Sequence, residues 1–295
     1  MIIERAPAKI NLALHVRRRR PDGYHDLETL FAFARDGDTV LVAPAEEWSL
    51  TITGPFAGAL GSPAEVEAVS PRLVPATAGE AFAVPDNLIE KAANAFTRVF
   101  PDIPPQAITL DKHLPVASGI GGGSADAAAT LRALARIAGV ASGDPRLTAM
   151  ARPLGADVPA CLLGRTSIGT GAGEELAVIE GRPGIPLLLV NPGVAVSTAA
   201  VFRAWDGVDR GALRDGNLIE RALAGRNDLA GPARLLAPLI GEVEELLAAA
   251  PGAILSRMSG SGATCFALFE TDADRDAAAG LAERRGWWTL PTSLA

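Results

Sequence analysis

The sequence predicts an α+β protein in which helices cover one face of mixed or antiparallel sheets. Three observations point to this class. Apolar and polar residues alternate near the start of the chain, a glycine-rich loop runs into a helix in the middle, and the second half reads in the order β-α-α-β-β-α-β. With 295 residues and 48% apolar content, the chain can bury a core in one large domain or in two. We expect two domains, residues 1–165 and residues 166–295.

The first expected elements are strands. Residues 10–16 alternate between apolar and polar side chains, which is typical of a half-buried strand. A turn is expected at residues 21–23 (Pro-Asp-Gly), and further β-rich stretches lie at residues 30–33, 39–42 and 49–53. Residues 54–85 are rich in Ala, Pro, Gly and Ser without a regular period, so they predict a long surface insertion.

Helices enter from Asn87 onward, where Glu90 completes a capping box. A short strand at residues 108–110 precedes the glycine-rich segment, and strong helix formers follow it at residues 125–137. In the second half we expect strands at residues 187–190, 253–257, 264–269 and near 287, and helices at residues 198–205, 235–249 and 272–284. This order of elements predicts a mixed α+β sandwich with helices on one face of an antiparallel sheet, and we expect the C-terminal domain to be ferredoxin-like.

The composition of the chain argues against several classes of function. A net charge of −7 argues against a general nucleic-acid binder or a binder of anionic membranes. No stretch of about 20 apolar residues could span a bilayer, and the first residues do not resemble a signal peptide. Cys161 and Cys265 lack the spacing of a metal site, so we expect buried, reduced thiols in a cytoplasmic protein. Of the 27 basic residues, the lysines are Lys9, Lys91 and Lys112, and a lysine kept among arginines can mark a position that needs a compact ammonium.

The glycine-rich segment, residues 119–124, predicts a phosphate-binding loop. Glycines let the main chain approach a ligand, and the helix that follows aims its positive end at the same point. A tight turn alone would explain one or two glycines but not four in five positions. A Walker A loop would need Gly-Lys-Ser/Thr at its end, and a dinucleotide fingerprint would need glycine where Ser124 stands.

Several single polar residues are also candidates for the functional site, and each has an alternative structural interpretation. Ser124 is expected to cap the helix, and its hydroxyl could also bind Mg²⁺. Lys9 and Asn11 lie two apart on the polar side of the first strand, either facing a common site or forming a solvated sheet face. Asp157 is a lone acid in an apolar stretch, so it either has a cationic partner or caps a helix that begins at Val158.

Five motifs occur in order along the chain: Pro7-Ala-Lys-Ile-Asn-Leu, Gly23-Tyr-His, Gly119-Ile-Gly-Gly-Gly-Ser-Ala-Asp-Ala-Ala, Leu154-Gly-Ala-Asp-Val-Pro and Ser259-Gly-Ser-Gly-Ala. Together they resemble the superfamily of galactokinase, homoserine kinase, mevalonate kinase and phosphomevalonate kinase. Within it they are most similar to a branch whose acceptor is a cytidine-diphosphate-linked polyol. The resemblance covers nearly the whole chain apart from residues 54–85. It implies a two-domain small-molecule kinase fold that uses ATP and Mg²⁺, with ATP-binding and catalytic residues in 1–165 and a substrate side in 166–295.

The resemblance also implies roles for individual residues. Lys9 and Asp157 would be the catalytic pair at the acceptor hydroxyl, and Asn11 would position the substrate. Tyr24 and His25 would grip the cytosine ring, with Phe202 as the opposite stacking face. The residues expected to bind ATP are Pro115, Ala117, Ser118, Gly119, Ile120, Gly121, Gly122, Gly123 and Ser124, the last of which would also bind the metal. A second glycine loop, formed by Gly260, Ser261 and Gly262, would close the site.

The sequence departs from the family pattern at two places, and two other functions compete with the kinase interpretation. Ala125 stands where a second serine is expected, and Ala117-Ser118 replaces a more glycine-rich run. An NAD-dependent dehydrogenase would need a fingerprint that the loop lacks. A non-catalytic ligand sensor would have lost Lys9 or Asp157. Because all kinase parts are present, the sequence predicts an ATP-dependent kinase that forms no phospho-enzyme intermediate, acting on this acceptor or on another small alcohol.

Overall fold

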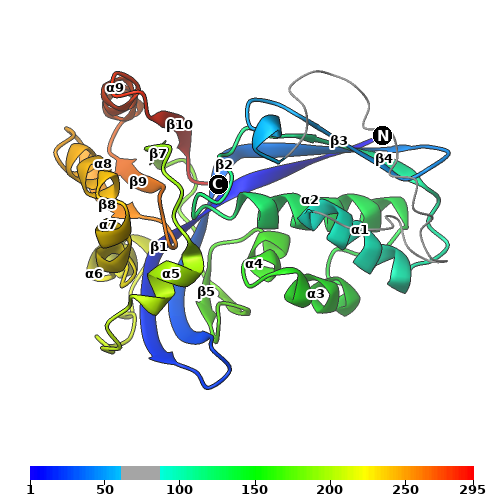
Figure 1. Cartoon of the computed structure of the whole chain (residues 1–295), viewed down its shortest axis with the longest axis horizontal. Coiled ribbons are helices and arrows are strands. Elements are labelled where there is room, and N and C mark those ends of the chain that lie inside the picture. Colours follow the sequence, from blue (N-terminus) through cyan, green and yellow to red (C-terminus); the bar gives the residue numbers. More distant parts are fainter. Residues whose placement is uncertain (61–86) are drawn as a thin grey trace. The chain divides into compact units, whose positions relative to one another are not determined.

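The computed structural model describes residues 1–60 and 87–295, and it forms two compact units (Figure 1). The first unit comprises Met1–Ala8, Gly37–Val116 and Gly121–Leu163, and the second comprises Lys9–Asp36, Ala117–Ile120 and Gly164–Ala295. The strands β1 (Ile2–Arg19) and β2 (His25–Pro44) pair with each other and contribute one stretch to each unit. The insertion expected at residues 54–85 lies mostly outside the described residues.

The first unit is a small sheet with its α-helices on one side (Figure 1). In its sheet, β4 pairs antiparallel with β2 and parallel with β3. Its elements besides β1 and β2 are β3 (Ser49–Thr53), η1 (Ala57–Leu60), α1 (Leu88–Val99), β4 (Gln106–Asp111), α2 (Gly122–Ile137), α3 (Pro145–Ala151), η2 (Arg152–Leu154) and α4 (Val158–Leu163). The strand expected at residues 49–53 and the capping box of the helix after Asn87 are both confirmed.

The second unit contains a four-stranded antiparallel sheet in the order β10-β7-β9-β8. This order and the helices between the strands confirm the expected ferredoxin-like sandwich. The elements are β5 (Ser167–Thr170), β6 (Glu175–Val178), β7 (Pro186–Asn191), α5 (Thr198–Arg203), α6 (Leu218–Ala224), α7 (Ala230–Leu236), α8 (Leu239–Ala248), β8 (Ala253–Met258), β9 (Cys265–Phe269), α9 (Asp272–Glu283) and β10 (Trp288–Ser293). Ile240 and Val243 of α8 and Ala278 of α9 pack into the core of this unit.

Two expectations about the elements are wrong. The single helix expected at residues 235–249 is divided between α7 and α8, because Pro238 has no N–H and disfavours helical geometry at the residue before it. The strand at residues 10–16 is not half-buried but buried on both faces. Its polar side chains make hydrogen bonds inside the protein instead of facing water. The alternation of polar and apolar residues along this strand therefore did not indicate which side chains are exposed to solvent.

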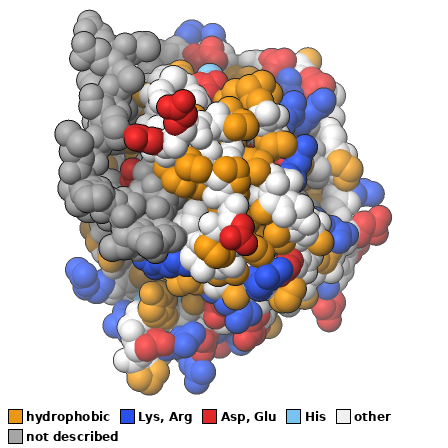
Figure 2. Space-filling view, turned by 90° about the vertical axis from the view of Figure 1, so that its right-hand side faces the viewer, with side chains coloured by type: hydrophobic (Ala, Val, Ile, Leu, Met, Phe, Trp, Pro, Cys, Tyr) orange, Lys and Arg blue, Asp and Glu red, His pale blue; other side chains and the backbone are white. Residues whose placement is uncertain are grey.

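Both cysteines, Cys161 and Cys265, are buried and free, as expected. None of the helices in the described part of the chain is long and apolar enough to cross a membrane. Figure 2 shows one face of the molecule, on which hydrophobic side chains gather near the centre and charged side chains of both signs surround them. That face therefore carries no field of a single sign.

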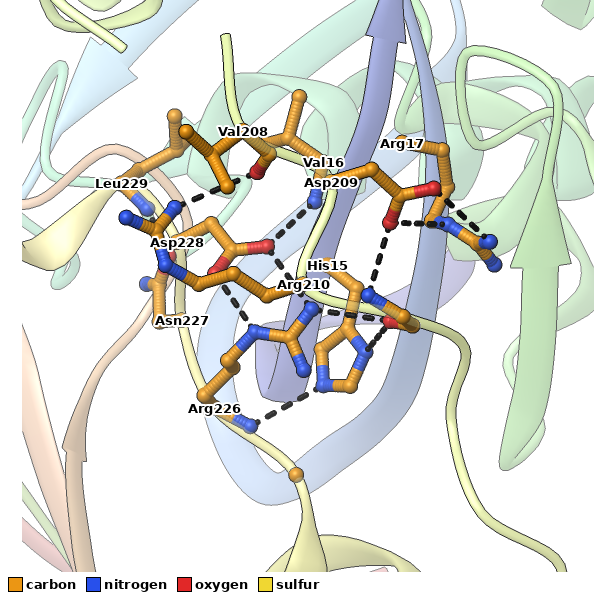
Figure 3. A network of polar contacts seen from close by, with 12 residues as sticks. His15, Val16, Arg17, Val208, Asp209, Arg210, Arg226, Asn227, Asp228 and Leu229 are labelled. Atoms are coloured by element: carbon orange, nitrogen blue, oxygen red, sulfur yellow. Dashed lines mark hydrogen bonds and ion pairs between the residues drawn. The ribbon is translucent and has the colours of Figure 1, made fainter. Parts of the chain in front are cut away.

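His15 joins β1 to two later segments of the second unit (Figure 3). Its Nε2 atom accepts a hydrogen bond from the Arg226 main-chain N–H at 3.2 Å, so the ring proton resides on Nδ1, which lies 3.0 Å from the Gly211 carbonyl oxygen. Burial, and after it the nearby Arg226 charge, lower the pKa of His15, although Asp228 and Glu28 act in the opposite direction. The buried ring is therefore neutral at pH 7.

This arrangement predicts that stability falls on mild acidification. Because the folded pKa of His15 lies below its unfolded value of about 6.5, the unfolded chain binds more protons, and the free energy of unfolding decreases as pH drops through that range. Urea unfolding between pH 8 and 5.5 should show a smaller decrease for His15→Gln than for the unsubstituted protein. Thr148→Ala, at an exposed position without a titratable group, serves as the control and should keep the original slope. Equal slopes for all three proteins would contradict the prediction.

Candidate functional site

Lys9 and Asn11 form a buried polar pair on β1. The Lys9 Nζ atom donates to Asn11 Oδ1 at 2.9 Å, and each residue is only 2% exposed. The Asn11 amide in turn donates to Thr29 Oγ1 at 2.7 Å, and the Lys9 ammonium lies 5.5 Å from the centre of the Phe31 ring. The alternative of a solvated sheet face is therefore wrong. A buried ammonium with fixed hydrogen-bond partners is positioned to act on a ligand rather than to solvate a surface.

The glycine-rich segment turns sharply before α2 begins. Ala117, Gly119 and Gly121 have positive φ values of 52°, 78° and 65°, and Gly121 is the N-cap of α2 without a side-chain cap. Because α2 starts at Gly122, Ser124 lies in its first turn, and the expected capping role of Ser124 is wrong. The N–H groups of that first turn have no acceptor within the helix, which leaves them available to an anion.

The start of this segment packs against the loop of residues 259–262, within the second unit. A Cβ atom on Gly119 would lie 2.6 Å from the carbonyl oxygens of both Ser259 and Gly262, so only glycine fits there. The Ser259 hydroxyl donates to the Gly119 carbonyl oxygen at 3.0 Å and accepts from the Asn11 main-chain N–H at 3.2 Å. The two glycine loops and the polar pair on β1 are therefore tied together by direct contacts.

The expected base-binding residues lie at the start of β2 and in α5. The His25 and Phe202 rings are 4.9 Å apart between centroids, and Trp205 meets His25 edge-on at 5.7 Å. Arg19 Nε donates to His25 Nε2 at 3.3 Å, and burial followed by the Arg19 charge lowers the pKa of His25. Tyr24 occupies the adjacent turn, and 61% of it is exposed. The structure thus brings His25 and Phe202 together and leaves the Tyr24 ring in solvent.

Asp157 stands directly before α4 and is half-buried. Its main-chain carbonyl accepts the first hydrogen bond of the helix, from the Cys161 N–H at 3.0 Å. Asp157 belongs to the first unit. The first unit also holds Pro115, Gly121, Gly122, Gly123 and Ser124, whereas the second unit holds Lys9, Asn11, Tyr24, His25, Ala117, Ser118, Gly119, Ile120, Phe202, Gly260, Ser261 and Gly262.

A buried ion cluster adjoins the glycine-rich segment in the first unit. Lys112 Nζ lies 2.6 Å from Asp38 Oδ2 and 2.7 Å from Asp126 Oδ2, and all three side chains are almost fully buried. A Cβ atom on Gly122 would lie 3.0 Å from that ammonium. Burial alone would lower the pKa of Lys112, but attraction to both carboxylates raises it, whereas burial raises the pKa of Asp126. The cluster therefore buries one ammonium between two carboxyl groups directly behind the first turn of α2.

Some contributors to the site were not assigned a role from the sequence. The scarcity of lysine pointed to Lys112, but nothing local indicated Asp38 as its partner. Ser259 stood in the second glycine motif without an assigned role, and Trp205 was expected only as the end of a helix. Ala117 has a positive φ, a main-chain conformation that glycine adopts most easily. This conformation explains why the family pattern is richer in glycine at this position.

Comparison with known proteins places this geometry among kinases. Residues 87–165 match the model of the GHMP kinases N terminal domain, and residues 209–284 match that of the GHMP kinases C terminal domain. Over 295 residues the chain is 56% identical to a 4-diphosphocytidyl-2-C-methyl-D-erythritol kinase of Rhizorhabdus wittichii, with 99% of this chain and 94% of the relative covered. A kinase of the same name from Methylorubrum extorquens is 45% identical, with 100% and 99% covered.

Solved structures agree with the sequence relatives. A crystal structure of 4-(cytidine 5'-diphospho)-2C-methyl-D-erythritol kinase matches with a TM-score of 0.75 and 32% identity, and it covers 100% of this chain and 99% of its own. A homoserine kinase from Cytophaga hutchinsonii matches with a TM-score of 0.66 at 18% identity, covering 99% and 93%. At that identity the homoserine kinase shows a common fold only.

The Lys112 cluster yields a prediction about stability. Lys112→Met should lower the free energy of unfolding by about 3 to 5 kcal/mol, because it leaves two buried carboxylates without their cation. The measurement is urea unfolding at pH 7. Lys91→Met, an exposed lysine on α1, is the matched control and should change stability by less than about 0.5 kcal/mol. A loss at Lys112 no larger than at Lys91 would show that the cluster contributes nothing to folding.

Proposed function

Because the chain belongs to the 4-diphosphocytidyl-2-C-methyl-D-erythritol kinase family within the GHMP kinases, we propose that it phosphorylates the 2-hydroxyl of 4-diphosphocytidyl-2-C-methyl-D-erythritol with ATP. The products are the 2-phosphate and ADP, in the non-mevalonate synthesis of isoprenoid precursors in the cytoplasm. The observation that carries the proposal is the direct contact of a phosphate-type glycine loop with the buried Lys9–Asn11 pair, through the Lys9 N–H and the Ile120 carbonyl oxygen at 2.9 Å.

ATP is proposed to bind with its phosphates on residues 119–124. The N–H groups of the first turn of α2, which have no acceptor within the helix, and the positive end of that helix favour an anion at this point. The Lys112 ammonium behind Gly122 is already paired with Asp38 and Asp126, so the positive potential at the loop comes from the main-chain N–H groups. Pro115, Ala117 and Ser118 would line the nucleoside side of the loop.

Mg²⁺ fits the donors of this loop. Ser124 supplies a half-buried hydroxyl in the first turn of α2, and hard cations prefer such oxygen ligands together with phosphate oxygens and water. Bound there, the ion would neutralise charge on the β- and γ-phosphates. Gly260, Ser261 and Gly262 would close the site, and the Ser261 hydroxyl is held by Thr198 Oγ1 at 2.8 Å.

Lys9 and Asp157 are proposed as the catalytic pair. Phosphoryl transfer passes through a loose transition state, so the protein contributes mainly alignment and cations that face the spreading charge. Lys9 would stabilise negative charge at the acceptor oxygen, and its hydrogen bond to Asn11 fixes the direction of the ammonium. Asp157 would accept or orient the proton of the acceptor hydroxyl, which lets the oxygen attack the γ-phosphorus directly.

A carboxylate in this role predicts a specific kinetic defect. Asp157→Asn should lower kcat by several orders of magnitude while the affinities for ATP and acceptor change little, because the amide keeps the shape and loses the anion. Steady-state kinetics and ATP-binding calorimetry measure the two effects. Asp102→Asn, at an exposed loop position, is the control and should turn over normally. Near-normal kcat for Asp157→Asn would remove Asp157 from the chemistry.

Tyr24, His25 and Phe202 are proposed to recognise the cytosine base of the acceptor. His25 Nε2 accepts from Arg19, and the lowered pKa keeps the ring neutral, so its proton resides on Nδ1. An Nδ1–H donor complements the N3 acceptor of cytosine, whereas uracil carries an N–H at that position. The exposed Tyr24 ring could then cover the base, since ring stacking adds about 1 to 3 kcal/mol but tolerates any base.

These separate roles of Tyr24 in stacking and His25 in hydrogen bonding predict the substrate preference. The cytidine-linked acceptor should be used much better than its uridine analogue, because uracil would leave buried polar groups unpaired. Tyr24→Ala should mainly raise KM, and Tyr24→Phe, which keeps the ring, should not. His25→Ala should abolish the preference for cytidine. If His25→Ala retains that preference, its side chain does not read the base; if the unsubstituted protein shows none, the whole base site is wrong.

A further inference from the structure

The Asn227 side chain is attached to the second glycine loop by two hydrogen bonds. Its Nδ2 atom donates to the carbonyl oxygens of Met258 and Gly260, each at 2.8 Å, and Asn227 is 8% exposed. Its Oδ1 atom accepts from the Leu229 main-chain N–H at 2.9 Å. Both N–H donors and the carbonyl of one amide are thus used on main-chain partners, a combination that a side chain of this length provides only as asparagine.

The segment that carries Asn227 is itself fixed to β1 (Figure 3). The Leu14 N–H donates to the Arg226 carbonyl oxygen at 2.7 Å, and the Asp228 N–H donates back to the Leu14 carbonyl oxygen at 2.9 Å. Asp228 Oδ2 accepts the Val16 N–H at 2.9 Å, while its Oδ1 accepts Arg226 Nε at 2.7 Å. The amide therefore projects from a rigid support on the strand that also carries Lys9.

Gly260 connects this hydrogen-bonded segment to the proposed site, because it packs directly against Gly119 and Asn11. A Cβ atom there would lie 2.8 Å from the Gly119 carbonyl oxygen and 3.4 Å from Asn11 Oδ1. The neighbouring Ser259 hydroxyl bonds to the same Gly119 oxygen. A shift of residues 258–260 would consequently move the start of the first glycine loop and disturb Asn11.

We propose that Asn227 is a positioning residue of the kinase reaction, which holds residues 258–260 so that Ser259 and Gly260 keep Gly119 and Asn11 aligned. The role of these residues in catalysis rests on the function proposed above. The hydrogen-bonded attachment itself does not depend on it.

Asn227→Asp tests the role with little change in shape. The variant keeps the acceptor for the Leu229 N–H but loses both donors and places a carboxylate against two carbonyl oxygens. We expect kcat/KM to fall by about 10²-fold, the scale that follows from a displacement of about 1 Å in an aligned site. Because a protonated carboxyl group regains one donor, activity relative to the unsubstituted protein should rise as pH is lowered from 8 to 6.

Asn217→Ala is the control, since it removes the N-cap of α6 and lowers Tm without touching either glycine loop. It should retain the original kcat and KM. Asn227→Ser, whose shorter side chain cannot reach the Met258 and Gly260 carbonyl oxygens, should lose activity at every pH from 6 to 8, and it serves if the Asp variant does not fold. If Asn217→Ala lost as much kcat/KM as Asn227→Asp for the same loss in Tm, the positioning role would be overturned.

A second readout needs no substrate. Hydrogen exchange of the main-chain amides of residues 118–120 and 259–262 should accelerate in Asn227→Asp and stay unchanged in Asn217→Ala. Unchanged exchange in Asn227→Asp would overturn the inference. An unsubstituted protein that fails to phosphorylate the cytidine-linked acceptor, but whose Asn227→Asp variant shows the faster exchange, would refute the proposed function and leave the attachment standing.

Discussion

The close approach of two glycine loops is the constraint on which the polar geometry of the second unit depends. Neither Gly119 nor Gly260 has room for a Cβ atom, because each would meet the main chain of the other loop at less than 3 Å. Only this absence of side chains lets the Ser259 hydroxyl reach the Gly119 carbonyl oxygen and the Asn11 N–H together. This close packing and the hydrogen bond from the Lys9 N–H to the Ile120 carbonyl oxygen at 2.9 Å together fix Lys9 relative to the start of the glycine loop.

Features that the sequence predicted correctly are encoded locally. The capping box at Asn87 and Glu90 lies within four consecutive residues, and the common side of Lys9 and Asn11 follows from the two-residue period of a strand. The ferredoxin-like order followed from the succession of elements, although Pro238 shows that a continuous apolar pattern can hide a break between two helices.

Features that could not be predicted depend on partners far away in the chain. Ser259 and Asn11 are 248 residues apart, and Lys112 and Asp38 are 74 apart, so no spacing rule connects them. Burial of β1 on both faces has the same origin. An alternating pattern indicates which side chains share a face, but whether the polar face meets water depends on what later segments place against it, here residues such as Arg226 and Gly211 around His15.

The second unit includes residues 9–36 as well as residues 164–295, and this has a consequence for protein synthesis. Thr292 Oγ1 donates to Asp36 Oδ2 at 2.6 Å across 256 residues, and the Ala295 N–H donates to the Phe33 carbonyl oxygen at 2.9 Å. Such contacts give the unit a high contact order, which slows folding because long loops must close first. As the chain leaves the ribosome, the stretches of β1 and β2 that are buried in the folded protein must wait for their final partners, and during that interval their apolar surface is open to aggregation.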